Sequence, residues 1–200
     1  MRYFQSSVRA IYTEQYRNDS DMIIAHFPQI TTIHAKSFYK CRNLNAARFP
    51  QVKIIGDGAF GDCVNLEIAD FPKAEIISDR VFYWCENLKI AHFPLTKIIG
   101  ERVFQGCKEL KTAHLPQVKI INDRAFEDCR NLEIADFPLA TCIKGEAFNG
   151  CEKLEIADFP QATSIGNYAF KNCKNLERAH FPQTEIIGQM AFQHCKDLKT

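Results

Sequence analysis

The chain has 200 residues, of which 46% are hydrophobic and 24% are charged, a globular mixture that argues against a disordered chain. Its 25 Lys and Arg against 24 Asp and Glu give a net charge of +1, which removes the bulk positive field that nonspecific nucleic-acid binding relies on. The sequence has no apolar run of about 18 residues, and its N-terminus lacks the apolar core of a secretion signal. We therefore expect no nucleic-acid partner and no membrane insertion.

Residues 1–22 are predicted to form an N-terminal cap, either a degenerate repeat or a helix. Residues 11–22 align in phase with a repeat that begins after them: Tyr16 matches Phe38, and Asp19 occupies a position that later copies give to cysteine. A polar substitution of this kind is typical of an end cap. The apolar residues of the segment also have helical spacing, which leaves an amphipathic helix as an equal alternative: Phe4, Val8, Ile11 and Tyr12.

Residues 23–200 carry about eight copies of a 22-residue repeat. The eight prolines are all in register: Pro28, Pro50, Pro72, Pro94, Pro116, Pro138, Pro160 and Pro182. Eight of the nine cysteines have the same period: Cys41, Cys63, Cys85, Cys107, Cys129, Cys151, Cys173 and Cys195. Phenylalanine precedes each of these cysteines by three residues, and leucine follows by three. A fixed period of this length predicts a solenoid, in which each unit buries its core against its neighbours.

The first half of each unit is predicted to be a short strand. In the copy over residues 131–153, Ala135 and Phe137 are apolar on either side of Asp136. This alternation is typical of a strand with one buried face. Pro138 then ends the strand because it has no N–H to give to a ladder.

The second half is predicted to return through a short helical turn. Ile143 re-enters the core, and Phe148 and Cys151 are three residues apart, so that both could face inward from one turn of helix. Pairs such as Gly56-Asp57 supply plausible helix N-caps. The expected fold is an α/β repeat solenoid with a parallel strand ladder on one side and short helical turns on the other.

The consensus L-x-x-A-x-F-P-x-x-x-x-I-G-x-x-A-F-x-x-C-x-x-L resembles the BspA-like leucine-rich repeat family. The resemblance implies a right-handed arc and a surface-exposed protein of bacteria or some protists that acts in adhesion. It therefore implies a cell-surface or secreted location, although a chain with reduced thiols would also fit the cytoplasm. The sequence departs from the family where alanine replaces a large aliphatic residue: Ala69, Ala91, Ala135 and Ala157.

The cysteines are predicted to be free, buried and structural. Phe-x-x-Cys-x-x-Leu places each thiol among core positions, where cysteine behaves as a small hydrophobic residue. Cys142 lies outside the period but occupies an isoleucine position, so it is also expected in the core. The sequence has no C-x-x-C or H-x-x-x-H zinc spacing, and we predict neither a metal centre nor a cofactor.

Two outward rows of the strand ladder form the candidate binding site, four and two residues before each proline. We expect a peptide- or protein-binding strip with an aliphatic floor and a titratable rim: Ile68, Asp70, Ile90, His92, His114, Ile134, Asp136, Ile156, Asp158 and His180. The alternatives are that these residues serve only strand propensity and solubility, or that four of them form a metal or proton site: Asp70, His92, His114 and Asp136.

Neighbours along the rim are about 5 Å apart in a parallel ladder. Asp70 should attract His92, and Asp158 should attract His180, whereas Asp136 and Asp158 should repel each other. His114 has a histidine on one side and an aspartate on the other, so its partner is left open.

We find no G-x-S-x-G, glycine-rich phosphate loop or H-E-x-x-H motif, and the chain is predicted not to be an enzyme. The leading hypothesis is a noncatalytic module that binds a protein through the strand face. The alternative is a scaffold that self-associates through its C-terminal coil, because the sequence stops in the opening residues of a further strand and no polar cap is visible.

Overall fold

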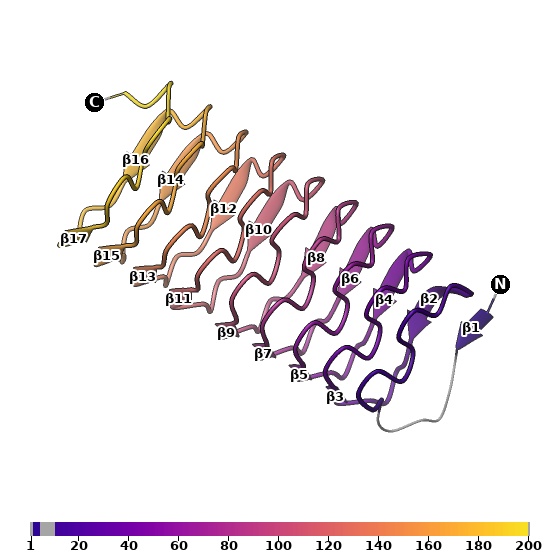
Figure 1. The fold of residues 1–200 in the computed structure, drawn as a ribbon. Helices are drawn as coiled ribbons and strands as arrows, with labels where there is room; N and C mark the ends of the chain where they lie inside the picture. The colour runs from indigo at the N-terminus through magenta and orange to yellow at the C-terminus, as the bar shows by residue number, and fades with distance from the viewer. Residues whose placement is uncertain (1, 5–10, 200) are drawn as a thin grey trace.

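The computed structural model describes residues 2–4 and 11–199, which form a stack of coils lying side by side in chain order (Figure 1). One strand of each coil belongs to what we call the front face: β1 Arg2–Phe4, β2 Met22–His26, β4 Ala46–Arg48, β6 Ile68–Asp70, β8 Ile90–His92, β10 Thr112–His114, β12 Ile134–Asp136, β14 Ile156–Asp158 and β16 Arg178–His180. A two-residue strand belongs to the side face: β3 Thr32–Ile33, β5 Ile54–Ile55, β7 Ile76–Ile77, β9 Ile98–Ile99, β11 Ile120–Ile121, β13 Cys142–Ile143, β15 Ser164–Ile165 and β17 Ile186–Ile187.

Paired strands of successive coils are parallel, and from β2 onward they keep a register of one repeat. Arg48 lies opposite Asp70, and Asp70 lies opposite His92. Because the register equals the repeat length, equivalent side chains form straight rows along the stack. The predicted repeat solenoid with a parallel strand ladder is confirmed.

The ladders are interrupted at two joints between coils. At the first seam, within the described residues, β8 is not joined to β10 and β9 is not joined to β11. At the second seam, again among the described residues, β12 is not joined to β14, although the side ladder continues from β13 to β15. The front face is therefore divided into three blocks.

Two rows of phenylalanine fill the core. One row follows the front strands and the other comes from the turns that precede each cysteine. In the turn row, the rings of Phe38 and Phe60 stack with centroids 4.9 Å apart. Phe49, from the front row, meets Phe60 edge-on at 5.8 Å. Small alanines such as Ala69 in the strands are fully buried beside these rings. Each buried ring contributes roughly 1.5–3 kcal/mol of apolar transfer free energy.

The predicted helical turn is wrong: the described residues contain no helix. In residues 36–41, the N–H groups of Lys36, Phe38 and Lys40 donate to carbonyl oxygens of the next coil, each at 2.8 Å. Only the alternate N–H groups, those of Tyr39 and Cys41, bond within the coil, to the carbonyl three residues earlier. Lys36 and Lys40 adopt φ of 54° and 61°, which a helix excludes. The turns thus form a third ladder of amides along the stack.

Residues 11–22 make the same contacts as the coils that follow. Ile11 forms a bridge with Ile33, and the Tyr16 ring stacks on Phe38 with centroids 5.3 Å apart. Asp19, at the cysteine position, accepts the N–H groups of Asp21 and Met22 through its carboxylate. The helix alternative for the cap falls largely on residues 5–10, which lie outside the described residues.

Candidate functional site

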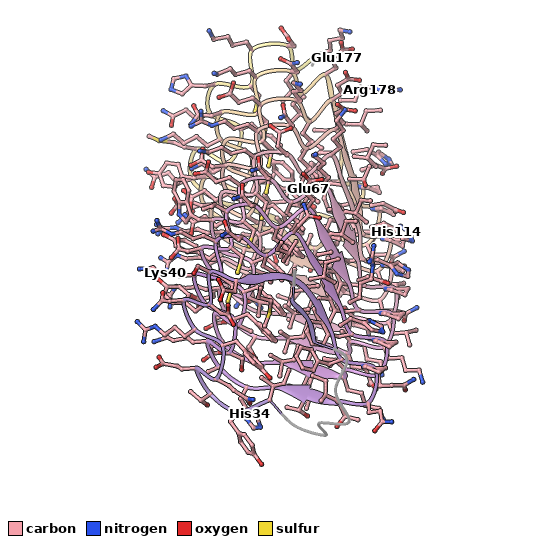
Figure 2. All side chains as sticks on the ribbon, turned by 90° about the vertical axis from the view of Figure 1, so that its right-hand side faces the viewer. His34, Lys40, Glu67, His114, Glu177 and Arg178 are labelled. Atoms are coloured by element: carbon pink, nitrogen blue, oxygen red, sulfur yellow. The ribbon has the colours of Figure 1, made fainter. Side chains whose placement is uncertain are left out.

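All ten candidate residues lie on the front face, on β6 to β16. Figure 2 places His114 and Arg178 on one side of the molecule and Lys40, from a turn, on the opposite side. In the isoleucine row, Ile90, Ile134 and Ile156 are exposed by 54%, 56% and 41%, whereas Ile68 is half-buried. Strand propensity alone does not require large aliphatic side chains at exposed positions of a rigid ladder. Such exposed side chains are typical of an interaction surface.

The rim histidines are paired with aspartates. His92 Nδ1 lies 2.9 Å from Asp70 Oδ1, and His180 Nδ1 lies 2.9 Å from Asp158 Oδ1. These are the neighbours that the sequence suggested. The structure also resolves the open case, because His114 Nδ1 lies 2.6 Å from Asp136 Oδ2 rather than beside His92.

Each of these pairs joins two strands within one block, so that no pair crosses a seam. The ladder is interrupted where His92 would lie next to His114, and again where Asp136 would lie next to Asp158. Five residues before the prolines, like charges also meet at both seams. These residues are Lys89 and Lys111 at the first seam, and Glu133 and Glu155 at the second.

Like charges directly opposite each other destabilise a strand pair. One like pair is not sufficient to open a joint, since β2 and β4 are joined although His26 lies opposite Arg48. At both seams, however, like residues meet at two positions of the strand. We attribute the interruptions of the front ladder to the repulsion of these two like pairs at each seam.

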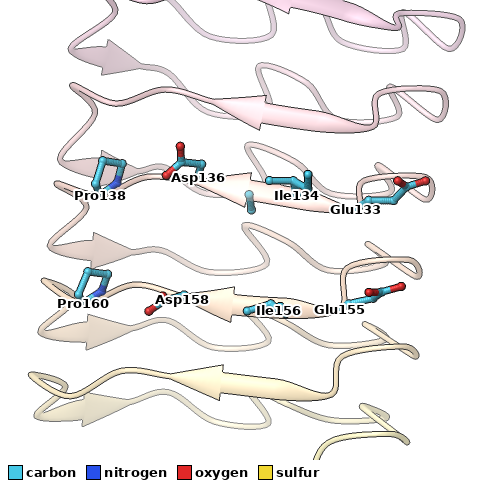
Figure 3. Close-up of a pocket in the computed structure, with 9 residues that line it drawn as sticks. Glu133, Ile134, Asp136, Pro138, Glu155, Ile156, Asp158 and Pro160 are labelled. Atoms are coloured by element: carbon cyan, nitrogen blue, oxygen red, sulfur yellow. The ribbon is translucent and has the colours of Figure 1, made fainter.

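The second seam contains a groove of about 580 Å³ on the front face (Figure 3). It contains four of the candidate residues together with five that the sequence analysis did not select. The full lining is Glu133, Ile134, Ala135, Asp136, Pro138, Glu155, Ile156, Asp158 and Pro160. The glutamates five residues before Pro138 and Pro160 were the available signal, but they become part of a groove only because the ladder opens there.

A second groove of about 560 Å³ lies at the first seam, on the side face, between β9 and β11. Its floor is aliphatic, with Ile98, Ile120 and Leu139 exposed by 54%, 45% and 41%. Lys97 and Lys119 lie at its edge. The sequence pattern indicated only core positions in the side strands and gave no sign of this surface.

The nine cysteines are free, and the thiols of the ladder bond along the stack. Cys63 Sγ donates to the Phe38 carbonyl oxygen at 3.0 Å, and Cys107 Sγ donates to that of Phe82 at 3.2 Å. Burial raises the pKa of the inner thiols well above the usual value: Cys63, Cys85, Cys107, Cys129, Cys151 and Cys173. A thiol that stays protonated is a poor nucleophile and a poor metal ligand, which fits a structural role.

Other kinds of site find no support in the described part of the chain. Residues 2–4 and 11–199 include no group of three or more His, Cys, Asp or Glu side chains that could hold a metal ion. The candidate set of Asp70, His92, His114 and Asp136 is divided by the first seam into two separate pairs. No helix in these residues could span a membrane.

The chain is similar to known repeat proteins. The family model described as BspA type leucine rich repeat region (6 copies) matches residues 9–98 and 75–199. The crystal structure of a leucine-rich repeat protein from T. pallidum is 21% identical, with a TM-score of 0.61, over 89% of this chain and 78% of that one. A leucine-rich repeat protein from Bacteroides ovatus is 22% identical, with a TM-score of 0.50, over 98% of this chain and 76% of that one.

A comparison with curated protein sequences gave no match. The family match covers most of the chain, and the structural similarities, at these identities, support the fold alone. The chain therefore belongs to the BspA-type leucine-rich repeat family, whose solenoid is generally a noncatalytic fold used for protein–protein interaction or adhesion.

Proposed function

We propose that this chain is a noncatalytic module that binds another protein through its front face. The observation that carries the proposal is the row of exposed isoleucines, Ile90, Ile134 and Ile156, set beside a rim of imidazoles and carboxylates. Ile134 and Ile156 are neighbours in the row, and Thr112 separates them from Ile90. Exposed apolar surface with a polar rim is typical of an interaction site. The ladder and the phenylalanine rows hold this surface in place, which lowers the entropy lost on binding.

The same face is a poor setting for catalysis. The front groove lies on an exposed surface, whereas most catalysis takes place in an enclosed site from which water is excluded. The imidazole–carboxylate pairs recur along the stack and act as links between neighbouring strands. They support the binding proposal by fixing the rim in one conformation.

The test compares two triple variants that each remove three exposed isoleucines. The front variant is Ile90→Ser, Ile134→Ser and Ile156→Ser, and the control is Ile54→Ser, Ile98→Ser and Ile120→Ser on the side face, which are exposed by 42%, 54% and 45%. Binders would be selected on the parent chain from a displayed peptide and domain library, and their affinity would then be measured for both variants. We expect binders of the parent chain to lose at least about tenfold affinity for the front variant only. Equal loss for the two variants would contradict a front-face site.

A second candidate is a scaffold that self-associates through its last coil. Ile187 is exposed by 61%, whereas the equivalent Ile143 and Ile165 of inner coils are exposed by 0% and 1%. Apolar core positions open to water favour burial against a second copy. Sedimentation velocity across a concentration series should then reveal dimers that Ile187→Ser removes. A monomer throughout the series would exclude this candidate.

A further inference from the structure

The groove at the second seam has an order that repeats on both walls. Figure 3 shows Glu133 and Glu155 at one end, the two isoleucines in the middle and Asp136 and Asp158 at the other end. A strand rises about 3.3 Å per residue, so the two carboxylate ends are on the order of 10 Å apart. The groove therefore has an apolar centre between two acidic ends.

The carboxylates at these ends have no cation between them. Glu133 and Glu155 form no ion pair with any described residue. Asp136 and Asp158 each contact an imidazole, but on the far side of their own strand, through Oδ2 and Oδ1 respectively. Four carboxylates thus face one groove with two imidazoles behind them, and a positive charge placed in the groove would relieve their mutual repulsion.

The backbone along the groove is also unpartnered. Across the joined pair β14–β16, Glu177 N–H donates to the Glu155 carbonyl at 2.9 Å and Phe159 N–H donates to the His180 carbonyl at 3.1 Å. The equivalent bonds across the second seam, from the N–H groups of Glu155 and Phe137, are missing within the described residues. The two strands remain in contact, which leaves no room for a third strand between them, so a ligand would lie across the face of the joint.

We propose that this groove binds an extended segment of a partner protein that carries two Lys or Arg side chains flanking an apolar residue. The proposal rests on the proposed function and specifies its ligand class. The apolar residue would cover Ile134 and Ile156, and the cations would meet the two carboxylate ends. In an extended peptide, residues i, i+2 and i+4 point to one side, and i and i+4 are about 13 Å apart, within reach of both ends for long side chains.

The test uses a labelled peptide, acetyl-Gly-Lys-Gly-Val-Gly-Lys-Gly-amide, and measures its binding by fluorescence anisotropy at low salt. Two comparison peptides replace both lysines by glutamate or the valine by serine. We expect the lysine–valine peptide to bind, the glutamate peptide to show no binding, and the serine peptide to bind severalfold more weakly. Equal binding of the lysine and glutamate peptides, or no binding of the lysine peptide, would overturn the proposal.

Matched charge variants locate the peptide. Glu133→Gln with Glu155→Gln should weaken binding at least tenfold. Glu101→Gln with Glu185→Gln changes the net charge equally at two exposed positions outside the groove. This control should leave the affinity for the peptide within about twofold of the parent value. Equal weakening by both variants would show general attraction to the chain and would overturn the proposal.

Failure of this proposal is distinguishable from failure of the proposed function. If library binders lose affinity for the isoleucine front variant but not for Glu133→Gln with Glu155→Gln, and show no preference for Lys or Arg, the front face binds protein without using the acidic ends. If binders are indifferent to both variants, the front-face function itself fails.

Discussion

The turn side and the strand side of this solenoid behave differently at the same joints. At the first seam both strand ladders stop, yet Phe104 N–H still donates to the Ala125 carbonyl at 2.8 Å on the turn side. At the second seam Phe148 N–H likewise donates to the Ala169 carbonyl at 2.7 Å. The turn ladder therefore continues across joints where strand ladders stop, and we attribute the openings to the variable charged residues of the strand side.

The largest expected effect concerns the thiols on the turn side. Burial raises the folded-state pKa of six inner thiols above the unfolded value of about 8.5. Their stabilisation is complete below that pH and is lost as pH rises from there toward the folded pKa. Each thiol would lose on the order of 1 kcal/mol by one pH unit above it, and the losses of several thiols combine.

Denaturant unfolding under reducing conditions at pH 7.5 and 9.5 checks this expectation. Cys107→Ala with Cys129→Ala should give a shallower loss of the free energy of unfolding between the two pH values. The same slope with and without the two thiols would show that they do not stay protonated in the folded chain.

The next effect tests whether the turn-side phenylalanines hold the stack across the joints. The Phe126 ring stacks on those of Phe104 and Phe148 at 5.2 and 5.4 Å and meets Phe137 edge-on at 5.5 Å. Phe126→Ala should lower the free energy of unfolding by about 3–5 kcal/mol. Cys129→Ala removes one sulfur from the same region and should cost less, about 1–2 kcal/mol. Equal costs in chemical denaturation would contradict this ranking.

The smallest effect tests whether like charges open the strand side. Glu155→Lys would place a positive charge opposite Glu133 across the second seam and opposite Glu177 across the joined pair β14–β16. We expect a gain of about 0.2–1 kcal/mol and slower hydrogen exchange at the Glu155 and Phe137 amides. Glu67→Lys is the inverse control, because it replaces the ion pair of Glu67 with Lys89, 3.1 Å apart, by a like pair at a joined position.

The exchange rates decide this last case. Because Glu67→Lys creates only one like pair and leaves Asp70 paired with His92, unchanged exchange at Lys89 and Ile90 would confirm that a single like pair does not open a joint. If Glu155→Lys left the Glu155 and Phe137 amides as unprotected as before, the second seam would have another cause than charge.

The sequence by itself determined the solenoid, because a 22-residue unit can bury Phe and Leu only against copies of itself, and it determined the strand by the alternation around Asp136. The conformation of the turn was not determined, because Phe148 and Cys151 can face inward from a helical turn and from the observed non-helical turn. The neighbouring coil decided it by accepting every second amide, which a single unit cannot show.

The groove was likewise decided by tertiary structure. The sequence contains Glu133 and Glu155 one repeat apart, but so are Glu155 and Glu177, which flank a joined pair of strands. The two joints differ two residues before the prolines. Asp158 pairs with His180 across the joined pair β14–β16, whereas Asp136 is its neighbour across the second seam. Only the register of the stacked coils brings both positions to the same joint, and we attribute the open ladder there to the sum of the two repulsions.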